Sequence, residues 1–248
     1  MAPLDAVPRR QCVILVGGLG TRLGALTRET PKPLMPIGDR PFLDILVRNV
    51  ARQGFGEVLL LAGYHADRIL DRYGPGAALA GELGIDLSVV CEPAPAGTAG
   101  ALVHAADRLA DAFLMMNGDS LFDIDLGALV AAPAAEPWIA KLALRAVPDA
   151  DRYGVVELDG DRIRSFRPRG PGGRPGLVNG GIYWMRRSVL DRIGTLPASI
   201  EQDVFPAAAA EGLLAGCRHD GYFLDIGVPE SLAEGQRVLP AWCAGRGI

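Results

Sequence analysis

The stretch CVILVGGLGTRLGALTRETPKP, residues 12–33, joins a continuous apolar run to a glycine-rich turn. The five apolar residues Cys12–Val16 have the length of a buried strand. A glycine-rich turn after such a strand is typical of phosphate sites, because small residues let backbone N–H groups approach an anion. Arg22 and Lys32 add positive charge within the same turn. We therefore predict a phosphate-binding loop over residues 17–33.

This loop matches neither of the two best-known glycine patterns. No glycine from 17 to 24 is followed at the right spacing by the Gly-Lys-Ser/Thr that ends the G-x-x-x-x-G-K-[ST] pattern. The dinucleotide pattern G-x-G-x-x-G fails at Leu23, and the next apolar run ends in LAG without an acidic residue for a ribose. The residues indicate a triphosphate cradle of a third type. The alternative is a tight strand–helix turn with solvated basic side chains.

The first half of the chain alternates strand and helix signals. Short apolar runs alternate with segments whose apolar residues recur at helical spacing. The expected strands are 12–16, 57–63, 85–92 and 112–119, and the expected helices are 41–54, 65–72 and 97–110. This alternation predicts a mostly parallel sheet covered on both faces, which binds ligands beyond the carboxyl ends of its strands. The loops 17–33, 92–100 and 117–125 are therefore expected on one rim.

The second half has longer strands with little helix between them. Strands are expected at 138–147 and 177–185, with a hairpin over 153–167 that turns at Asp159-Gly160. Helical segments return near 200–211 and 229–239. The predicted fold class is α/β: a Rossmann-like, mostly parallel central sheet with helices on both faces and a mixed sheet extension in the second half. We predict a single domain, 1–248, with two halves, 12–135 and 136–240.

Composition narrows the function classes. The net charge is −4 and the 25 basic residues are spread along the chain, which argues against a nucleic-acid footprint. The four cysteines and three histidines are scattered, so we expect buried reduced thiols and no zinc site. Neither the N-terminal segment nor any other run has the form of a signal peptide or membrane span. We expect a cytoplasmic protein that does not bind membranes.

A series of seven motifs, from GGLGTRLGALTRETPKPLMPIGDRPFL (17–43) to YFLDIGVPE (222–230), resembles those of the sugar-1-phosphate nucleotidyltransferases. The resemblance runs from Cys12 to about Val238 and is strongest for the bacterial D-glycero-α-D-manno-heptose 1-phosphate guanylyltransferases. N-acetylmuramate 1-phosphate uridylyltransferases and mannose 1-phosphate guanylyltransferases are near alternatives. The motifs that carry it are GGLGTRLGALTRETPKPLMPIGDRPFL (17–43), EPAPAGTAGAL (92–102), NGDSLFDIDL (117–126), DRYGVVELD (151–159), GLVNGGIY (176–183), SIEQDVFP (199–206) and YFLDIGVPE (222–230).

The resemblance implies a nucleotide-diphospho-sugar transferase fold and a Mg²⁺-dependent reaction. An NTP, with GTP favoured, and a sugar 1-phosphate would give an NDP-sugar and pyrophosphate, as in cell-surface polysaccharide biosynthesis. The first half would bind the nucleotide and the second half the sugar phosphate. The resemblance leaves a homo-oligomer open. A protein of another class, a non-catalytic NDP-sugar-binding regulator, is the alternative, although it would not need both metal-binding carboxylates described below.

Matching motifs imply the residues that hold the nucleotide. Leu15, Gly17 and Gly18 would lie against the base and ribose, and Gly97 and Thr98 would form the second base-contacting loop at the start of a helix. The triphosphate would be held by Gly20, Thr21, Arg22 and Lys32, with Arg22 stabilising the departing pyrophosphate.

Two acids, Asp119 and Asp225, match the carboxylates that hold the metal in this family. Mg²⁺ takes a few carboxylates together with phosphate oxygens and water, so two acids are chemically sufficient. The alternatives are an Asx turn for Asp119 and a helix N-cap for Asp225. Asp123 and Asp125 are expected to cap the next short helix.

The sugar phosphate is expected to lie in the second half. Resemblance implies a pocket that includes Gly118, Tyr153, Gly154, Asn179, Gly180, Gly181 and Glu201. Glu201 would accept hydrogen bonds from sugar hydroxyls, unless it is only a first-turn helix glutamate. Where the family has a catalytic lysine that contacts the sugar phosphate, Arg169 is the best counterpart, which replaces a point charge by a planar fork. The adjoining PRGPGGRPG is either a lid or a linker.

Overall fold

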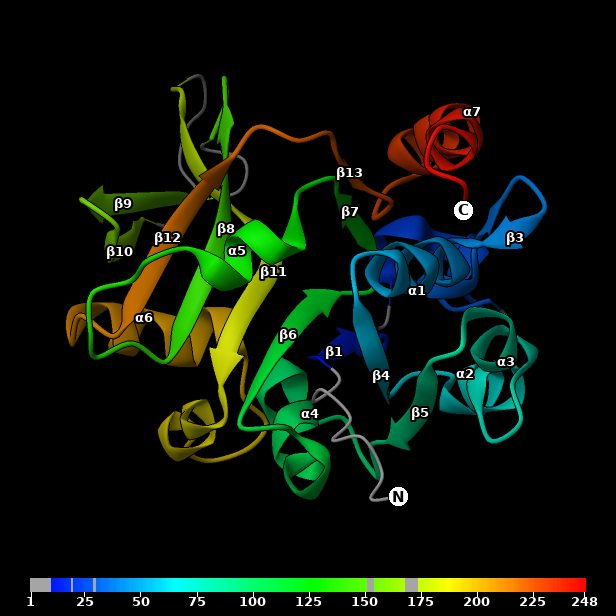
Figure 1. Ribbon diagram of the computed structural model, residues 1–248, viewed down its shortest axis with the longest axis horizontal. Helices are drawn as coiled ribbons and strands as arrows, with labels where there is room; N and C mark the ends of the chain where they lie inside the picture. Colours follow the sequence, from blue (N-terminus) through cyan, green and yellow to red (C-terminus); the bar gives the residue numbers. More distant parts are fainter. Residues whose placement is uncertain (1–9, 19, 29, 151–153, 168–173) are drawn as a thin grey trace, which may run out of the picture.

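One mixed sheet forms the framework of the protein. The computed structural model describes residues 10–18, 20–28, 30–150, 154–167 and 174–248. Within them the sheet has nine strands in the order β5-β4-β1-β6-β11-β8-β12-β10-β9, and it runs through both halves of the chain (Figure 1). Its strands are β1 (Arg10–Leu15), β4 (Phe55–Ala62), β5 (Asp86–Cys91), β6 (Ala112–Asn117), β8 (Ala140–Val147), β9 (Val155–Asp159), β10 (Arg162–Arg167), β11 (Gly176–Arg186) and β12 (Leu214–His219).

The first four of these strands confirm the predicted parallel half. β5, β4, β1 and β6 are parallel neighbours, because helices carry the chain back between them. The crossovers contain α1 (Phe42–Arg52), α2 (Ala66–Tyr73), α3 (Ala78–Leu83), and α4 (Gly97–His104) followed by the short 3₁₀ helix η3 (Ala106–Arg108). The sequence pattern did not indicate α3.

The expected helix over 97–110 ends early, at His104. Two hydrogen bonds from the buried Gln11 side chain explain the stop. Its Nε2 donates to Arg108 O at 2.8 Å, and its Oε1 accepts from Ala110 N at 2.9 Å. These bonds hold the chain in the non-helical path that leads into β6.

The mixed extension is also confirmed. β11 joins antiparallel to β6 and β8, β12 lies parallel to β8, and the β9–β10 hairpin closes the edge. The hairpin turns at Gly160, whose φ is +62°, as the Asp-Gly signal predicts. The predicted helix over 200–211 consists of the π-helical turn η5 (Ile200–Val204) and α6 (Phe205–Ala210). Pro206 has no N–H to donate, which disrupts regular α-helical bonding at their junction.

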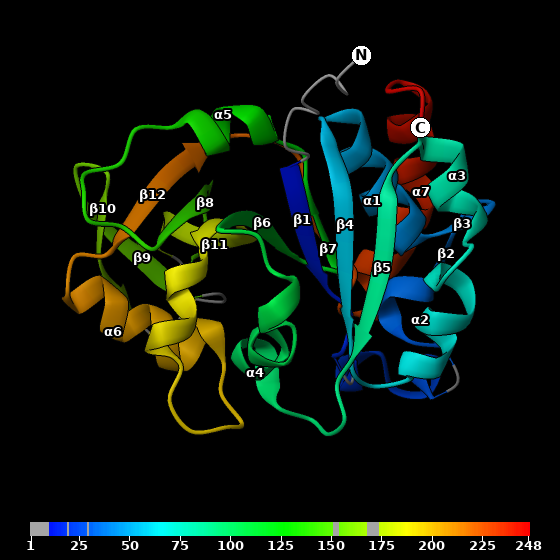
Figure 2. The ribbon, with the colours of Figure 1, turned by 60° about the horizontal axis from the view of Figure 1, so that its bottom comes forward.

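Helices cover both faces of the sheet. Side chains alternate along β1, so that Cys12 and Ile14 belong to one buried cluster and Val13 to the other. The first cluster packs under α1, α2, α3 and α7 (Pro229–Ala244), and the second packs under α4, η5 and α6 (Figure 2). Among the described helices, none has both the length and the apolar character needed to cross a lipid bilayer.

The four cysteines are free thiols, but only two are buried. Cys12 and Cys243 lie in the core and Cys217 is half-buried, whereas Cys91 is exposed. The prediction of burial is therefore wrong for Cys91, because this residue ends β5, the edge strand of the sheet. Burial raises the pKa of the Cys12 thiol far above its usual range, which keeps this thiol protonated.

Candidate functional site

Three loops meet beyond the carboxyl ends of the parallel strands, on the rim where the sequence predicts them. Backbone hydrogen bonds join them: Gly118 N donates to Leu15 O at 2.8 Å, Tyr64 N to Gly17 O at 3.2 Å, and Glu92 N to Ala62 O at 2.8 Å. The loops that follow β1, β5 and β6 are thus tied side by side, with the turn after β4 between the first two. The site is built on the ends of rigid strands.

The loop after β1 is held by packing around Lys32. Gly20 has φ +67°, and a Cβ on it would lie 2.8 Å from the Thr27 side chain and 3.0 Å from Lys32 Cγ. Only glycine fits this position without strain. The Thr27 hydroxyl donates to Gly20 O or Gly24 O, each at 3.2 Å. The loop is therefore a fixed cradle that directs the buried Lys32 toward the rim.

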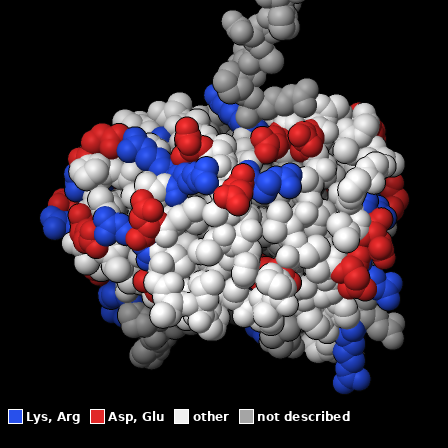
Figure 3. All heavy atoms as spheres, turned by 90° about the horizontal axis from the view of Figure 1, so that it is seen from below, with Lys and Arg blue, Asp and Glu red and all other residues white. Residues whose placement is uncertain are grey.

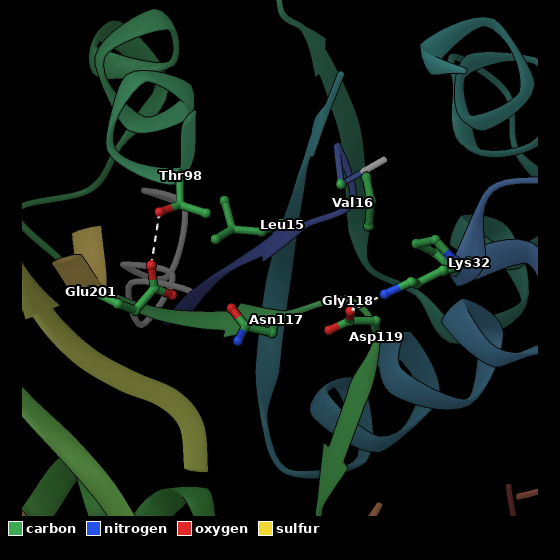
Figure 4. A pocket seen from close by; sticks show the side chains of 10 residues that line it. Leu15, Val16, Lys32, Thr98, Asn117, Gly118, Asp119 and Glu201 are labelled. Carbon is green, nitrogen blue, oxygen red and sulfur yellow. Dashed lines mark hydrogen bonds and ion pairs between the residues drawn. The ribbon is translucent and has the colours of Figure 1, made fainter. Parts of the chain in front are cut away.

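A cavity of about 190 Å³ opens between these loops (Figure 4). Seven residues predicted for the site line it, together with Val16, Pro33 and Asn117. The seven are Leu15, Gly18, Lys32, Thr98, Gly118, Asp119 and Glu201. Residues up to 186 positions apart in sequence therefore share one cavity, as the matching motifs imply.

A second cavity, of about 500 Å³, adjoins the first. Asn117 and Glu201 line both cavities. The others that line it are Gly154, Val156, Phe166, Arg167, Asn179, Gly181, Tyr183, Gln202 and Pro206. Four of the residues predicted for the sugar phosphate, Gly154, Asn179, Gly181 and Glu201, are among them. The two cavities therefore meet at one pair of polar side chains.

A short antiparallel ladder sets Asp119 and Asp225 near one another. Strands β7 (Ser120–Phe122) and β13 (Phe223–Asp225) pair so that Asp225 lies opposite Ser120, and Ile226 N donates to Asp119 O at 2.9 Å. The Asp225 side chain accepts from Gly227 N at 2.6 Å. It does not cap α7, whose N-cap residue is Val228. Tertiary pairing thus places two carboxylates together from positions far apart in sequence.

Each of these carboxylates has a cationic neighbour. Lys32 Nζ lies 3.2 Å from Asp119 Oδ2, and Arg22 Nη2 lies 3.8 Å from Asp225 Oδ2. A Cβ on Gly227 would come within 2.8 Å of Arg22 Nη2, so this glycine leaves room for the guanidinium. Burial, followed by the negative charge of Asp119, raises the pKa of Asp225. Two acids and two bases thus form one compact cluster, which we call the carboxylate cluster.

The carboxylate oxygens of the carboxylate cluster suit a hard divalent cation that takes its remaining ligands from water and phosphate groups. The described residues contain no group of three or more His, Cys, Asp or Glu side chains suited to hold a metal ion. Two neighbouring carboxylates, one of which (Asp225) has a pKa raised by burial and by the charge of the other, are nevertheless suited to Mg²⁺, which keeps waters and phosphate oxygens among its ligands. Such a cation would need the substrate's phosphates to complete its coordination.

Replacing each carboxylate by asparagine is expected to change stability in opposite directions when no divalent cation is present. Asp119→Asn leaves the buried Lys32 ammonium without a charged acceptor, so it should lower the free energy of unfolding by about 1–3 kcal/mol. Asp225→Asn removes a carboxylate whose raised pKa shows that the fold disfavours its charge, so the melting temperature should rise. Thermal unfolding in EDTA measures both shifts. Shifts in the same direction would contradict this account.

Glu201 links the two cavities through hydrogen bonds. Its Oε2 accepts from Thr98 Oγ1 at 2.9 Å (Figure 4). The same oxygen accepts from Ser199 Oγ at 3.1 Å, and Tyr183 OH lies 3.4 Å from Oε1. Burial raises the pKa of Tyr183 well above its usual range, so the phenol remains a donor. Glu201 is thus more than a first-turn helix residue, because it joins η5 to the start of α4.

Of the two adjacent glycines in β11, Gly180 and Gly181, it is Gly181 that lines the second cavity. Asn179 Nδ2 donates to Tyr183 OH at 2.9 Å, and its Oδ1 accepts from Gly181 N at 2.9 Å. A Cβ on Gly181 would lie 2.9 Å from Asn117 Nδ2. Gly180, in contrast, is packed against Phe122, where a Cβ would come within 2.5 Å of the ring. Its place in the structure follows from core packing, and it is not among the residues that line either cavity.

Some predicted residues have other surroundings or lie outside the described part. Tyr153 and Arg169 lie outside the described residues, as does most of PRGPGGRPG, and nothing is described of the Thr21 side chain. Gly17 packs against Gly63, where a Cβ would meet Gly63 N at 2.8 Å, and Gly97 packs in the same way against Ala198. These two glycines allow the loops to pack closely against neighbouring backbone.

Asp125 caps α5 (Leu126–Ala131) as predicted, since its Oδ1 accepts from Ala128 N at 3.0 Å. The same prediction is wrong for Asp123. Its Oδ2 accepts from Trp242 Nε1 at 3.0 Å and from Arg246, so it ties the segment after β7 to the end of α7. The sequence offers no local signal for such a long-range partner.

Sequence reasoning missed several residues that line the cavities. Asn117 precedes Gly118-Asp119 at the end of β6, and its polar side chain after an apolar run was a usable signal. Tyr183, Phe166 and Val156 lie in strands where apolar side chains are expected, so nothing marked them. Arg167 also lines the second cavity and pairs with Glu157 at 3.0 Å.

One face of the molecule is mixed in charge. On the face shown in Figure 3, the described acidic and basic side chains are interleaved in a band. On this face no large patch of one sign is seen among the described residues. A polyanionic partner would find little there to steer it.

The chain matches one protein family over nearly its whole length. A model described as nucleotidyl transferase matches residues 11–241. The chain is 36% identical over 222 residues to D-glycero-alpha-D-manno-heptose 1-phosphate guanylyltransferase of Campylobacter jejuni, covering 89% of this chain and 96% of that protein. It is 34% identical over 232 residues to mannose-1-phosphate guanylyltransferase of Mycobacterium tuberculosis, covering 92% of this chain but 64% of that protein.

A solved structure is similar as well. HddC from Yersinia pseudotuberculosis complexed with GMP-PN superposes with a TM-score of 0.77 at 28% sequence identity. The match covers 93% of this chain and 99% of that chain. The sheet, the helical layers and the rim described above are therefore shared along nearly the whole length of both chains.

Proposed function

Because the chain belongs to the nucleotidyl transferase family, we propose that it catalyses guanylyl transfer from GTP to a sugar 1-phosphate. The products are a GDP-sugar and pyrophosphate. The fold is the nucleotide-diphospho-sugar transferase fold. We propose heptose 1-phosphate as the sugar phosphate in preference to mannose 1-phosphate, because this chain covers 96% of the heptose enzyme and 64% of the mannose enzyme.

One observation carries the proposal: the carboxylate cluster borders the cavity that adjoins a second, larger one. Lys32, Asp119 and Gly18 line the smaller cavity, whereas Asn179 and Tyr183 line the larger. This arrangement suits a nucleoside triphosphate in the smaller cavity and a sugar phosphate in the larger one. The side chains that both cavities share, Asn117 and Glu201, would lie between the two substrates.

The reaction needs positioning and charge neutralisation more than a nucleophilic side chain. A phosphate oxygen of the sugar 1-phosphate attacks the α-phosphorus of GTP and forms the new P–O bond. The bond from the α-phosphorus to the bridging oxygen breaks, and pyrophosphate leaves with that oxygen. Lys32 and Arg22 would neutralise the phosphate charge, with Arg22 near the departing pyrophosphate. Arg169 would contact the sugar phosphate.

Mg²⁺ is proposed as the cation that the carboxylate cluster holds. Asp119 and Asp225 would be its protein ligands, because a cation would relieve the repulsion that the charge of Asp119 exerts on Asp225. When bound, the ion supplies neutralisation of charge on the triphosphate. The protein side chains then orient the phosphates so that the α-phosphorus is open to attack from the side of the second cavity.

The sugar is proposed to lie in the second cavity. Asn179, Gly181 and Glu201 offer hydrogen-bonding groups there, and Gly154 leaves space. Glu201 Oε2 already accepts two hydrogen bonds, from Thr98 and Ser199, whereas Oε1 has only the longer one from Tyr183 OH, so Oε1 is the oxygen better placed to accept from sugar hydroxyls. A sugar with several hydroxyls suits a cavity lined by an amide, a phenol and a carboxylate.

A pyrophosphate-release assay tests this function. GTP, UTP and ATP are each combined with D-glycero-α-D-manno-heptose 1-phosphate, mannose 1-phosphate or N-acetylmuramate 1-phosphate in the presence of Mg²⁺. We expect the highest kcat/KM for GTP with the heptose phosphate. Preference for mannose phosphate or for UTP with N-acetylmuramate phosphate would reassign the substrates. Absence of turnover with every pair, together with binding of an NDP-sugar, would indicate a regulator instead.

A further inference from the structure

The hydroxyl of Thr98 is held by two neighbouring residues of another segment. Its Oγ1 donates to Glu201 Oε2 at 2.9 Å (Figure 4). The same oxygen accepts from Ile200 N at 2.8 Å. A hydroxyl has a single proton to donate, and here a carboxylate accepts it. The side chain of Thr98 therefore has no donor left for a nucleotide base, although the matching motifs place this residue in a base-contacting loop.

The segment that Thr98 contacts has an unusual backbone. Ile200 is the first residue of η5, a π-helical turn, so its N–H has no acceptor within the turn. Such turns are rare and are found frequently at functional sites. Ser199 N donates to Asp203 Oδ2 at 2.7 Å, and Gln202 N donates to Ser199 Oγ at 3.2 Å. Thr98 supplies, from the start of α4, the acceptor that the first N–H of this turn requires.

The bond from Thr98 also determines which oxygen of Glu201 is left for a ligand. Thr98 lines the smaller cavity, and Glu201 lines both. While Thr98 and Ser199 hold Oε2, the other oxygen, Oε1, lies 3.4 Å from Tyr183 OH, whose residue lines the larger cavity. The carboxylate is thus oriented before any ligand arrives.

We infer that Thr98 is a positioning residue for sugar recognition, because its hydroxyl orients the Glu201 carboxylate in the larger cavity. This inference rests on the proposed binding of the sugar there. A glutamate side chain loses rotamer freedom when a ligand orders it, and a bond that orders it beforehand removes part of that cost. Without the hydroxyl, the ligand itself would have to order the carboxylate, at the expense of affinity for the sugar.

Two ligands isolate the contribution of the sugar to binding. GDP presents the base, the ribose and the phosphates, and GDP-D-glycero-α-D-manno-heptose adds the sugar. In calorimetry with Mg²⁺, the wild-type protein should bind the GDP-sugar more tightly than GDP. In Thr98→Val, which keeps the shape without the hydroxyl, this ratio of affinities should fall about tenfold, the effect of one hydrogen bond to a charged group. The affinity for GDP itself should stay close to that of wild type.

Two results of this comparison would overturn the inference. A wild-type ratio near 1 would show that the sugar is not recognised in the larger cavity. An equal loss of affinity for both ligands in Thr98→Val would assign the hydroxyl to the nucleotide. Thr98→Ser restores the hydroxyl and should return the ratio to near the wild-type value. Thr195→Val, which alters an exposed threonine shortly before η5, is the matched control and should leave the ratio unchanged.

A double-mutant cycle separates positioning of Glu201 from a general effect on folding. Glu201→Ala removes the group that Thr98 orients, so adding Thr98→Val to it should change the ratio little further. If the losses in the two single variants instead multiply in the double variant, Thr98 acts independently of Glu201 and the inference fails. The ratio compares two ligands on the same folded protein, so a loss of folded material does not alter it.

The outcomes also separate this inference from the proposed reaction. If the ratio falls in Thr98→Val but no sugar 1-phosphate is turned over, the reaction fails and the positioning role stands. If turnover occurs and Thr98→Val raises the KM for GTP without raising that for the sugar 1-phosphate, the positioning role fails and the reaction stands. We expect the reverse: a KM for the sugar 1-phosphate raised about tenfold and a KM for GTP close to that of wild type.

Discussion

Asp119→Asn is expected to lower kcat for GDP-sugar formation by about 1,000-fold, corresponding to several kcal/mol of lost transition-state charge stabilisation. The substitution removes one of the two charges proposed to hold Mg²⁺ and the charged acceptor of Lys32. Shape and size are conserved, so the protein should remain folded at assay temperature. Steady-state pyrophosphate release at saturating Mg²⁺ measures the loss.

Asp225→Asn should give a loss of the same order, although we expect it to stabilise the apo fold. The double variant should be little worse than either single variant, because both acids act on one cation. Asp125→Asn is the matched control: it lies six residues from Asp119, caps α5, and asparagine caps equally well. Rates near wild type for Asp119→Asn or Asp225→Asn would show that the metal site is elsewhere.

Gly97→Ala is expected to reduce the free energy of unfolding by about 3 kcal/mol, from left-handed strain together with overpacking. Gly97 has φ +77°, and a Cβ there would lie 2.3 Å from Ala198 O. Two backbone hydrogen bonds close this contact: Ala99 N donates to Ala198 O and Ala198 N to Ala96 O, both at 2.9 Å. The side chain would force apart the loops that carry Thr98 and Glu201.

Urea unfolding followed by circular dichroism measures this change. Gly81→Ala is the control, because Gly81 lies in α3 with open space around its Cα. Alanine there should raise stability by about 0.5–1 kcal/mol, since glycine is a poor helix former. If Gly97→Ala were as mild as Gly81→Ala, the loop would be more adaptable than its packing indicates. Activity should fall in Gly97→Ala even at temperatures where it is folded.

Much of the site could be predicted because parallel strands end on a common rim. The glycines after β1, Lys32, Thr98 and Asp119 each stand just after a strand or at the start of a helix, where side chains and N–H groups meet a ligand. Local chemistry in the sequence indicated the glycines and Lys32, and the resemblance of the motifs indicated Thr98 and Asp119. The roles given to them remain predictions, and Asp119→Asn tests the one given to Asp119.

Other features could not be predicted because they depend on partners far away in the chain. Asp123 looked like a helix cap, but it bonds Trp242 across 119 positions. Gly180 looked like a pocket glycine, but it makes room for Phe122. Cys91 looked buried, but its strand is at the sheet edge. Each of these residue types occurs in both of the environments compared, and the tertiary packing determined which environment each residue has.

The amino-acid sequence by itself determined the α/β class, the parallel half, the hairpin at Gly160 and the glycine-rich turn after β1. These follow from periodicity and turn chemistry, both of which act over a few residues. Only the tertiary structure decided that Asp225 approaches Asp119 and that Glu201 bonds Thr98. Those contacts depend on strand order and on how distant loops pack together, and neither is encoded in any one segment.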